Sequence, residues 1–179
     1  MKVTETKLKG AYLVSPDTHI DERGTFREVY HHERYKEFIP KLPEFVQDNV
    51  STSKRGVLRG LHYQKTRPQA KLVQCLVGEI FDVIVDVRVR SETYGKWQSF
   101  TLSEENRTQL YVPPGFAHGF QVLSEYSICH YKCSAYYDPS DEACLKWDDS
   151  YLSIAWPLED LVVSTKDRLG TGLPCLEAK

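Results

Sequence analysis

The sequence lacks a long apolar run and an excess of either charge. It has 23 basic and 25 acidic residues among 179, a net charge of −2, so nothing indicates a general surface for nucleic acid. A membrane-spanning helix needs about 20 apolar residues, and no stretch approaches that length. Residues 1–9 also lack the apolar segment of a signal peptide. We therefore expect neither nucleic acid nor membrane as a partner.

Cysteines are few, odd in number and without Cys-x-x-Cys spacing: Cys75, Cys129, Cys133, Cys144 and Cys175. This pattern argues against a disulfide framework and against a structural zinc site. Buried free thiols in a reducing compartment are the simpler interpretation. We expect a cytoplasmic protein.

The length and composition predict a single domain. A chain of 179 residues, with 41% hydrophobic and 27% charged residues, is too apolar for disorder and large enough to bury a core. We expect one domain over residues 1–179. Its outer N-terminal strands should cover about 1–50, its barrel core about 51–138 and its C-terminal arm about 139–179.

Turn signals are dense, and short runs rich in β-branched and aromatic residues lie between them. In residues 80–87 the odd positions are apolar, whereas Asp82 and Asp86 interrupt the other face. Residues 31–38 look helical, and residues 158–161 are expected to begin a turn or a short helix after Pro157. Further strands are expected at 71–77, 97–102, 109–112, 119–123 and 127–137. The pattern predicts a mainly all-β fold, a jelly-roll barrel with a few short helices.

Residues 56–64, Gly-Val-Leu-Arg-Gly-Leu-His-Tyr-Gln, combine glycines with charged and polar side chains. Glycines beside Arg59 and His62 in a strand favour close approach of a ligand. The alternative to a ligand site is a purely structural one, in which His62 is half-buried with its hydrogen bond satisfied. Strict alternation would place His62 and Gln64 on one face and Arg59 on the other.

Residues 113–118, Pro-Pro-Gly-Phe-Ala-His, follow this strand in a way that resembles the cupin superfamily of double-stranded β-helix barrels. Many cupins bind a metal through His and Glu. Here Gln64 stands at a histidine position of that pattern, and Lys71 stands where a metal-binding cupin has Glu. A lysine ammonium does not ligate a divalent cation. We therefore expect a barrel with no metal.

The remaining chemistry suits proton transfer next to a carbonyl. Within the expected strand 127–137, Tyr131 and Tyr137 fall on one face. A histidine base at His62, a tyrosine acid at Tyr131 and a cation at Lys71 together favour epimerisation through an enolate. Such a reaction needs no redox cofactor and no metal.

The ordered motifs closely resemble one cupin family, the dTDP-4-keto-6-deoxyglucose (dTDP-4-dehydrorhamnose) 3,5-epimerases. The matching segments span about residues 8–168 and include 21–24, 45–49, 56–64, 71–73, 78–82, 112–120, 131–133, 146–149 and 164–167. The resemblance implies a homodimer with exchanged strands, a nucleotide-sugar substrate and no cofactor.

The resemblance also implies residue roles. His62 would be the general base, oriented by Asp167, and Tyr131 the general acid. Lys71 would stabilise the enolate. The implied substrate-binding residues are Arg23, Phe26 (from a neighbouring subunit), Glu28, Gln47, Asn49, Arg59 (near the diphosphate), His118 (at the sugar), Tyr137 (stacked on the base), Glu142 and Lys166.

Two departures from the family pattern stand out. Ala143-Cys144 follows Glu142 where the family often has Arg-Gly, and residues 169–179 show no clear family pattern. Three alternatives stay open at this point. The chain could be a single-site 3- or 5-epimerase of the same family, a metal-dependent cupin enzyme, or a non-catalytic sugar-nucleotide-binding protein.

Overall fold

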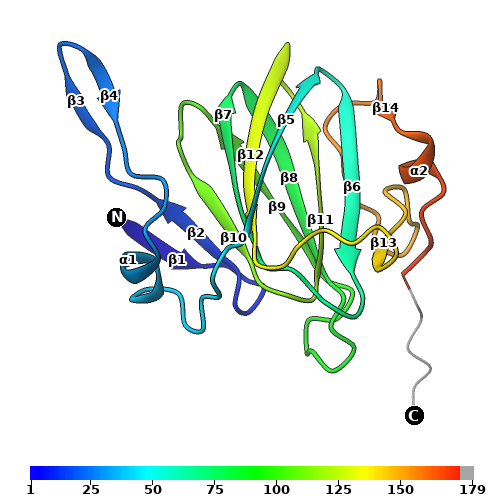
Figure 1. Ribbon diagram of the computed structural model, residues 1–179. Coiled ribbons are helices and arrows are strands. Elements are labelled where there is room, and N and C mark those ends of the chain that lie inside the picture. The colour runs from blue at the N-terminus through cyan, green and yellow to red at the C-terminus, as the bar shows by residue number, and fades with distance from the viewer. Residues whose placement is uncertain (174–179) are drawn as a thin grey trace.

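Two large sheets pack face to face in the computed structural model, which describes residues 1–173 (Figure 1). The first sheet contains, in spatial order, β1 (Lys2–Glu5), β2 (Tyr12–Ser15), β10 (Gln109–Val112), β7 (Lys71–Val77), β12 (Tyr126–Cys133) and β5 (Gln47–Lys54). The second contains β13 (Glu142–Cys144), β6 (Val57–Gln64), β11 (Phe116–Val122), β8 (Glu79–Asp86) and β9 (Trp97–Ser103), and β14 (Val162–Val163) pairs in parallel with β6. The predicted mainly-β jelly-roll fold is confirmed.

Outside the two sheets lie a hairpin and two short helices. The hairpin of β3 (His19–Asp21) and β4 (Gly24–Phe26) projects away from the sheets (Figure 1). Helix α1 (His32–Lys36) lies within the predicted helical segment 31–38. Among the described residues, no helix has the length and apolar character needed to cross a membrane.

Of the turn or short helix expected at 158–161, the helix does not form, and the chain bends at residues 159 and 160. The second helix, α2 (Thr165–Arg168), begins instead after Ser164. The Ser164 hydroxyl accepts a hydrogen bond from the backbone N–H of Asp167. This cap satisfies an N–H that would otherwise lack a partner at the helix start, so a local signal fixes where Asp167 sits.

Both faces of β8 are covered, but by different parts of the structure. Val83 and Val85 pack against Leu145 and Ile154 of the C-terminal arm. The other face contributes apolar side chains to the core between the sheets and also carries the fully buried Asp82. The acidic interruptions seen in the sequence therefore mark the inner face of a strand that is buried on both sides.

Strand β6 contains an irregularity that changes which side chains share a face. His118 of β11 pairs with His62, whereas Phe120 pairs with Arg59. Two residue steps on β11 thus match three on β6, so β6 holds one extra residue, as in a β-bulge. The extra residue reverses the alternation, and Arg59 and His62 line the same cavity. The expectation that Arg59 points away from His62 is wrong for this reason.

Strand β12 is shorter than predicted. It ends at Cys133, and Tyr137 lies in the following loop. The expected sharing of a strand face by Tyr131 and Tyr137 is therefore wrong. Both rings nevertheless line one cavity, because the loop after β12 turns back toward β6, where the backbone N–H of Asp138 donates to the Gln64 side chain.

Gly60 is the residue that permits the close contact between β6 and β11. Its φ is +125°, and a Cβ there would lie 2.5 Å from the Cα of Gly119. We predict that Gly60→Ala lowers the free energy of unfolding by roughly 3 kcal/mol or more. The alanine would have to adopt an unfavourable φ, and strands β6 and β11 would also have to move apart. Urea unfolding of the purified protein measures this loss.

The matched control is Gly24→Ala in the β3–β4 turn. Gly24 has a similar φ of +122°, but nothing lies within 4 Å of its would-be Cβ. Gly24→Ala should lower the free energy of unfolding by only about 1–2 kcal/mol, the cost of placing an alanine in that backbone conformation. Equal losses for the two variants would show that the close approach to Gly119 is unimportant.

Candidate active site

A cavity of about 690 Å³ opens between the two sheets, with side chains from both sheets in its wall. Most of the residues predicted from the sequence line it: Gln47, Asn49, Arg59, His62, Lys71, His118, Tyr131, Tyr137, Glu142, Lys166 and Asp167. They come from strands, a loop and helix α2 that lie far apart in the chain, so the tertiary fold brings them together.

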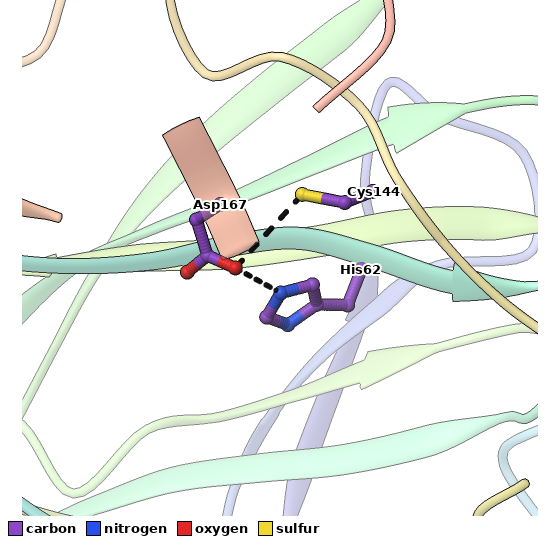
Figure 2. Close-up of side chains that lie close together, drawn as sticks. All are labelled: His62, Cys144 and Asp167. Carbon is purple, nitrogen blue, oxygen red and sulfur yellow. Dashed lines mark hydrogen bonds and ion pairs between the residues drawn. The ribbon is translucent and has the colours of Figure 1, made fainter. Parts of the chain in front are cut away.

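His62 and Asp167 form a hydrogen-bonded pair on one wall. The Nε2 atom of His62 lies 2.7 Å from Oδ1 of Asp167 (Figure 2). The other carboxylate oxygen accepts the backbone N–H of Gly60 at 3.2 Å. Burial raises the pKa of Asp167, but the hydrogen bond and charge of His62, with the N–H of Gly60, outweigh it and hold that pKa below its usual range. An ionised Asp167 keeps the proton of a neutral His62 on Nε2, which leaves Nδ1 as a base.

Lys71 and Tyr131 stand on the opposing sheet, in β7 and β12. The Lys71 ammonium lies 5.9 Å from the centroid of the Tyr131 ring. Lys71 is buried, and the loss of hydration lowers its pKa despite nearby Cys133 and Asp82. Burial raises the pKa of Tyr131. The phenol therefore keeps its proton at neutral pH, as a general acid must.

A second histidine–carboxylate pair lies beside the first. His118 sits opposite His62 in the β6–β11 register, and its Nε2 is 2.8 Å from Oδ2 of Asp82. Burial raises the pKa of Asp82, partly offset by His118 and Lys71. The other oxygen of Asp82 has no hydrogen-bond partner within residues 1–173. Sequence reasoning noted Asp82 only as an interruption of an apolar strand, because its partner is remote in the chain.

At the other end of the cavity, polar side chains form a connected network. The Tyr137 hydroxyl donates to Glu142 at 3.0 Å, and Lys166 forms an ion pair with the same carboxylate. Gln47 accepts the backbone N–H of Tyr137 and donates to Asn49. This end offers an exposed aromatic ring beside a cation and several amides, which are groups that suit a nucleotide.

Three predicted site residues lie outside the cavity of this chain. Arg23 and Phe26 are exposed on the β3–β4 hairpin, with Phe26 71% exposed. Glu28 forms an ion pair with Arg34 next to the hairpin. The fold of one chain does not bring these side chains to His62.

Cys144, expected from the sequence as a free thiol and as part of a departure from the family pattern, lies beside the His62–Asp167 pair (Figure 2). Its Sγ is 4.0 Å from Oδ1 of Asp167. Possible ligand atoms of the three side chains lie within 4.8 Å of one another. Strand β13 places the thiol there, because Cys144 is the register partner of His62.

Comparison with known proteins gives consistent matches. The family model described as dTDP-4-dehydrorhamnose 3,5-epimerase matches residues 5–174. The curated enzyme of that name from Methanothermobacter thermautotrophicus is 48% identical over 167 residues, 92% of this chain and 90% of that protein.

Solved structures agree with the sequence matches. The epimerase of Legionella pneumophila, crystallised with dTDP-4-keto-L-rhamnose, superposes with a TM-score of 0.94 at 44% identity, covering 96% of this chain and 92% of that one. ChmJ of Streptomyces bikiniensis, a 3'-monoepimerase in complex with dTDP-quinovose, gives 0.88 at 34% identity, covering 94% and 86%. The shared sequence extends over nearly the whole chain, both sheets included, and this chain belongs to the dTDP-4-dehydrorhamnose 3,5-epimerase family.

Proposed function

We propose that the protein epimerises a nucleotide-diphospho-4-keto-6-deoxyhexose at C3 and C5, converting dTDP-4-dehydro-6-deoxy-D-glucose to dTDP-4-dehydro-L-rhamnose. The observation that carries this proposal is the placement of His62 and Tyr131 on opposing sheets around one cavity. A ring held between them meets a base on one side and an acid on the other. The Legionella relative, solved with a keto-sugar nucleotide, supports the substrate class.

In this mechanism His62 removes the proton on the carbon next to the C4 ketone. The C–H electron pair moves into the ring, and the ketone becomes an enolate. The proton enters at Nδ1, and the resulting imidazolium is stabilised by Asp167, which lies 2.7 Å from Nε2. Because C3 and C5 both adjoin C4, the same base can serve both positions in turn.

Lys71 and Tyr131 complete the reaction from the other sheet. A buried cation near the keto oxygen stabilises the enolate more strongly than it would in water. Tyr131 then donates its proton to the opposite face of the carbon, and solvent restores the protonation of both residues. No electrons are exchanged with a cofactor.

The nucleotide would occupy the end of the cavity near Tyr137. Tyr137 offers a face for stacking on the base. Arg59 and Lys166 offer cations for the diphosphate, and the planar guanidinium of Arg59 suits paired oxygens. Lys166 is paired with Glu142 in the free protein, so substrate would compete with that carboxylate.

Single-site epimerisation is the second candidate. It is favoured by the similarity to ChmJ, a 3'-monoepimerase with the same fold at 34% identity. The same base and acid serve one position or two, and the outcome depends on how the ring turns between the sheets.

We further propose that the protein is a cytoplasmic homodimer and that residues 1–179 form one domain. The N-terminal β1–β2 and the C-terminal β14 join the same sheets as the central strands, which supports one domain. Four free cysteines among the described residues fit a reducing compartment. The projecting hairpin, with Ile20 and Phe26 more than 70% exposed, supports exchange between two chains.

The central test is incubation with dTDP-4-dehydro-6-deoxy-D-glucose in heavy water. We expect deuterium at both C3 and C5 and the L-rhamno product, located by NMR and mass spectrometry without added cofactor. Deuterium at one carbon alone would establish the single-site alternative. Binding with no exchange would contradict an epimerase.

Two variants in the same assay separate base from acid. His62→Ala should reduce exchange at both carbons by about a hundredfold or more, because proton removal is lost. Tyr131→Phe should impair net epimerisation more than deuterium exchange, because His62 can still remove the proton when Tyr131 no longer donates one to the opposite face. Equal loss of both signals in the Tyr131 variant would contradict a separate acid.

Lys71→Met should lower activity and raise stability. The variant should lose kcat, because the enolate loses its cation, while the free energy of unfolding rises by about 1–3 kcal/mol. The pKa of Lys71 is lowered in the folded protein. Its buried charge therefore destabilises the protein most at pH values below that folded-state pKa. The gain should therefore shrink as pH approaches about 10.4, the unfolded lysine value.

Urea titrations across pH measure this gain, with the exposed Lys65→Met as control. Lys65 is exposed, so its charge is already hydrated. The Lys65→Met variant should change the free energy of unfolding by less than about 0.5 kcal/mol. A less stable Lys71→Met protein with unchanged kcat would contradict the assigned role.

Phe26→Ala tests the exchanged hairpin. If the ring of one chain stacks on the base bound by the other, KM should rise about tenfold with little change in kcat. Sedimentation should give twice the chain mass of 20.7 kDa. Val89→Ala, at another exposed apolar side chain (62% against 71% for Phe26), is the control. A monomer of full activity would contradict both parts.

A further inference from the structure

Cys144 gives the base pair a third potential metal ligand. Its thiol, the His62 imidazole and the Asp167 carboxylate converge within 4.8 Å, and each is anchored by secondary structure in β13, β6 or α2. Asp167 is held further by the Gly60 N–H and the Ser164 cap. A nitrogen, a sulfur and an oxygen donor form the ligand set that borderline cations such as Zn²⁺ favour.

Two of the three separations between ligand atoms are close to those of a tetrahedral zinc site, and the third is at most 4.8 Å. With Zn–N and Zn–O near 2.0–2.2 Å and Zn–S near 2.3 Å, ligand atoms lie roughly 3.4–3.6 Å apart. The observed Nε2–Oδ1 and Sγ–Oδ1 separations are 2.7 and 4.0 Å. Each needs to change by less than about 1 Å. Since His62 and Asp167 also line the cavity, a fourth position would face it, as in zinc sites that keep one coordination place open.

The Cys144 thiol binds zinc as the thiolate, so its proton must leave when the metal enters. A zinc ion supplies the positive charge that displaces the thiol proton. The nearby carboxylate, which opposes a bare thiolate, also ligates the metal.

We propose that His62, Cys144 and Asp167 form an inhibitory Zn²⁺ site that reversibly blocks the catalytic base. Zinc on Nε2 takes the place of the ring proton there, so the neutral ring carries its proton on Nδ1. The thiol proton leaves to solvent. With Nδ1 protonated and Asp167 bound to the metal, His62 can no longer accept a proton from the sugar. The inhibitory effect rests on the proposed function, whereas metal binding does not.

Binding is measured on the full chain with metal alone. Zn²⁺ titration against a chromophoric chelator should give one site per chain. Co²⁺ as a spectroscopic substitute should give a thiolate-to-cobalt absorption band. Cys144→Ser should abolish the band and weaken zinc binding by about tenfold or more, because one of three protein ligands loses its soft donor. Cys144→Ala provides a second variant should the serine protein fold poorly.

Cys133→Ser is the matched control, because Cys133 is a free thiol that lines the cavity but does not belong to the His62–Cys144–Asp167 cluster. It should leave the zinc affinity and the cobalt band as in the wild type. Absence of the band from the wild type, or equal zinc affinity in the Cys144 variants, would overturn the proposal.

Inhibition is measured by deuterium exchange into the substrate. Zinc should suppress exchange by the wild type, and a chelator should restore it. With each protein's rate taken relative to its own zinc-free rate, half-inhibition of Cys144→Ser should need about tenfold more zinc. Equal sensitivity of both proteins would overturn the proposal. A wild type that shows the cobalt band but never exchanges deuterium would refute the proposed epimerisation while leaving the metal site intact.

Discussion

The extra residue in strand β6 is the constraint on which the site depends. It lets Arg59 and His62 face one cavity, and it brings the backbone so close to β11 that Gly60 and Gly119 leave no room for a Cβ. The same segment binds Asp167 twice, through the Gly60 N–H and the His62 ring. The position of Asp167 against His62 therefore depends on the backbone of strand β6 as well as on the helix that carries the carboxylate.

Two opposed sheets give the cavity its chemical asymmetry. The wall built on β6 and β11 carries two histidines, each paired with a carboxylate, whereas the wall built on β7 and β12 carries Lys71 and Tyr131. Burial depresses the pKa of the lysine and raises that of the phenol. A buried cation lowers the stability of the fold, and in the proposed mechanism Lys71 offsets that cost when negative charge develops on the substrate beside it.

Local sequence patterns predicted the strands well where residues alternate or form short apolar runs, and β7 and β10 have the predicted bounds. They failed where tertiary contacts decide. The segment at 158–161 has no helix, and β12 stops before Tyr137 because the chain turns back toward β6. Asp82 and Cys144 received no role, since each gains its partner from a strand distant in sequence. Arg23, Phe26 and Glu28 match the family pattern but lie outside the cavity of one chain.

The sequence by itself determined the mainly-β class, the order of the motifs and the kinds of side chain available for proton transfer, because these follow from periodicity and residue chemistry. The tertiary structure alone decided that His62 and Tyr131 stand on opposing walls, that Arg59 shares the face of His62, and that the Cys144 thiol lies next to His62. Sheet packing and one additional backbone residue set these relations, and neither leaves a periodic signal along the chain.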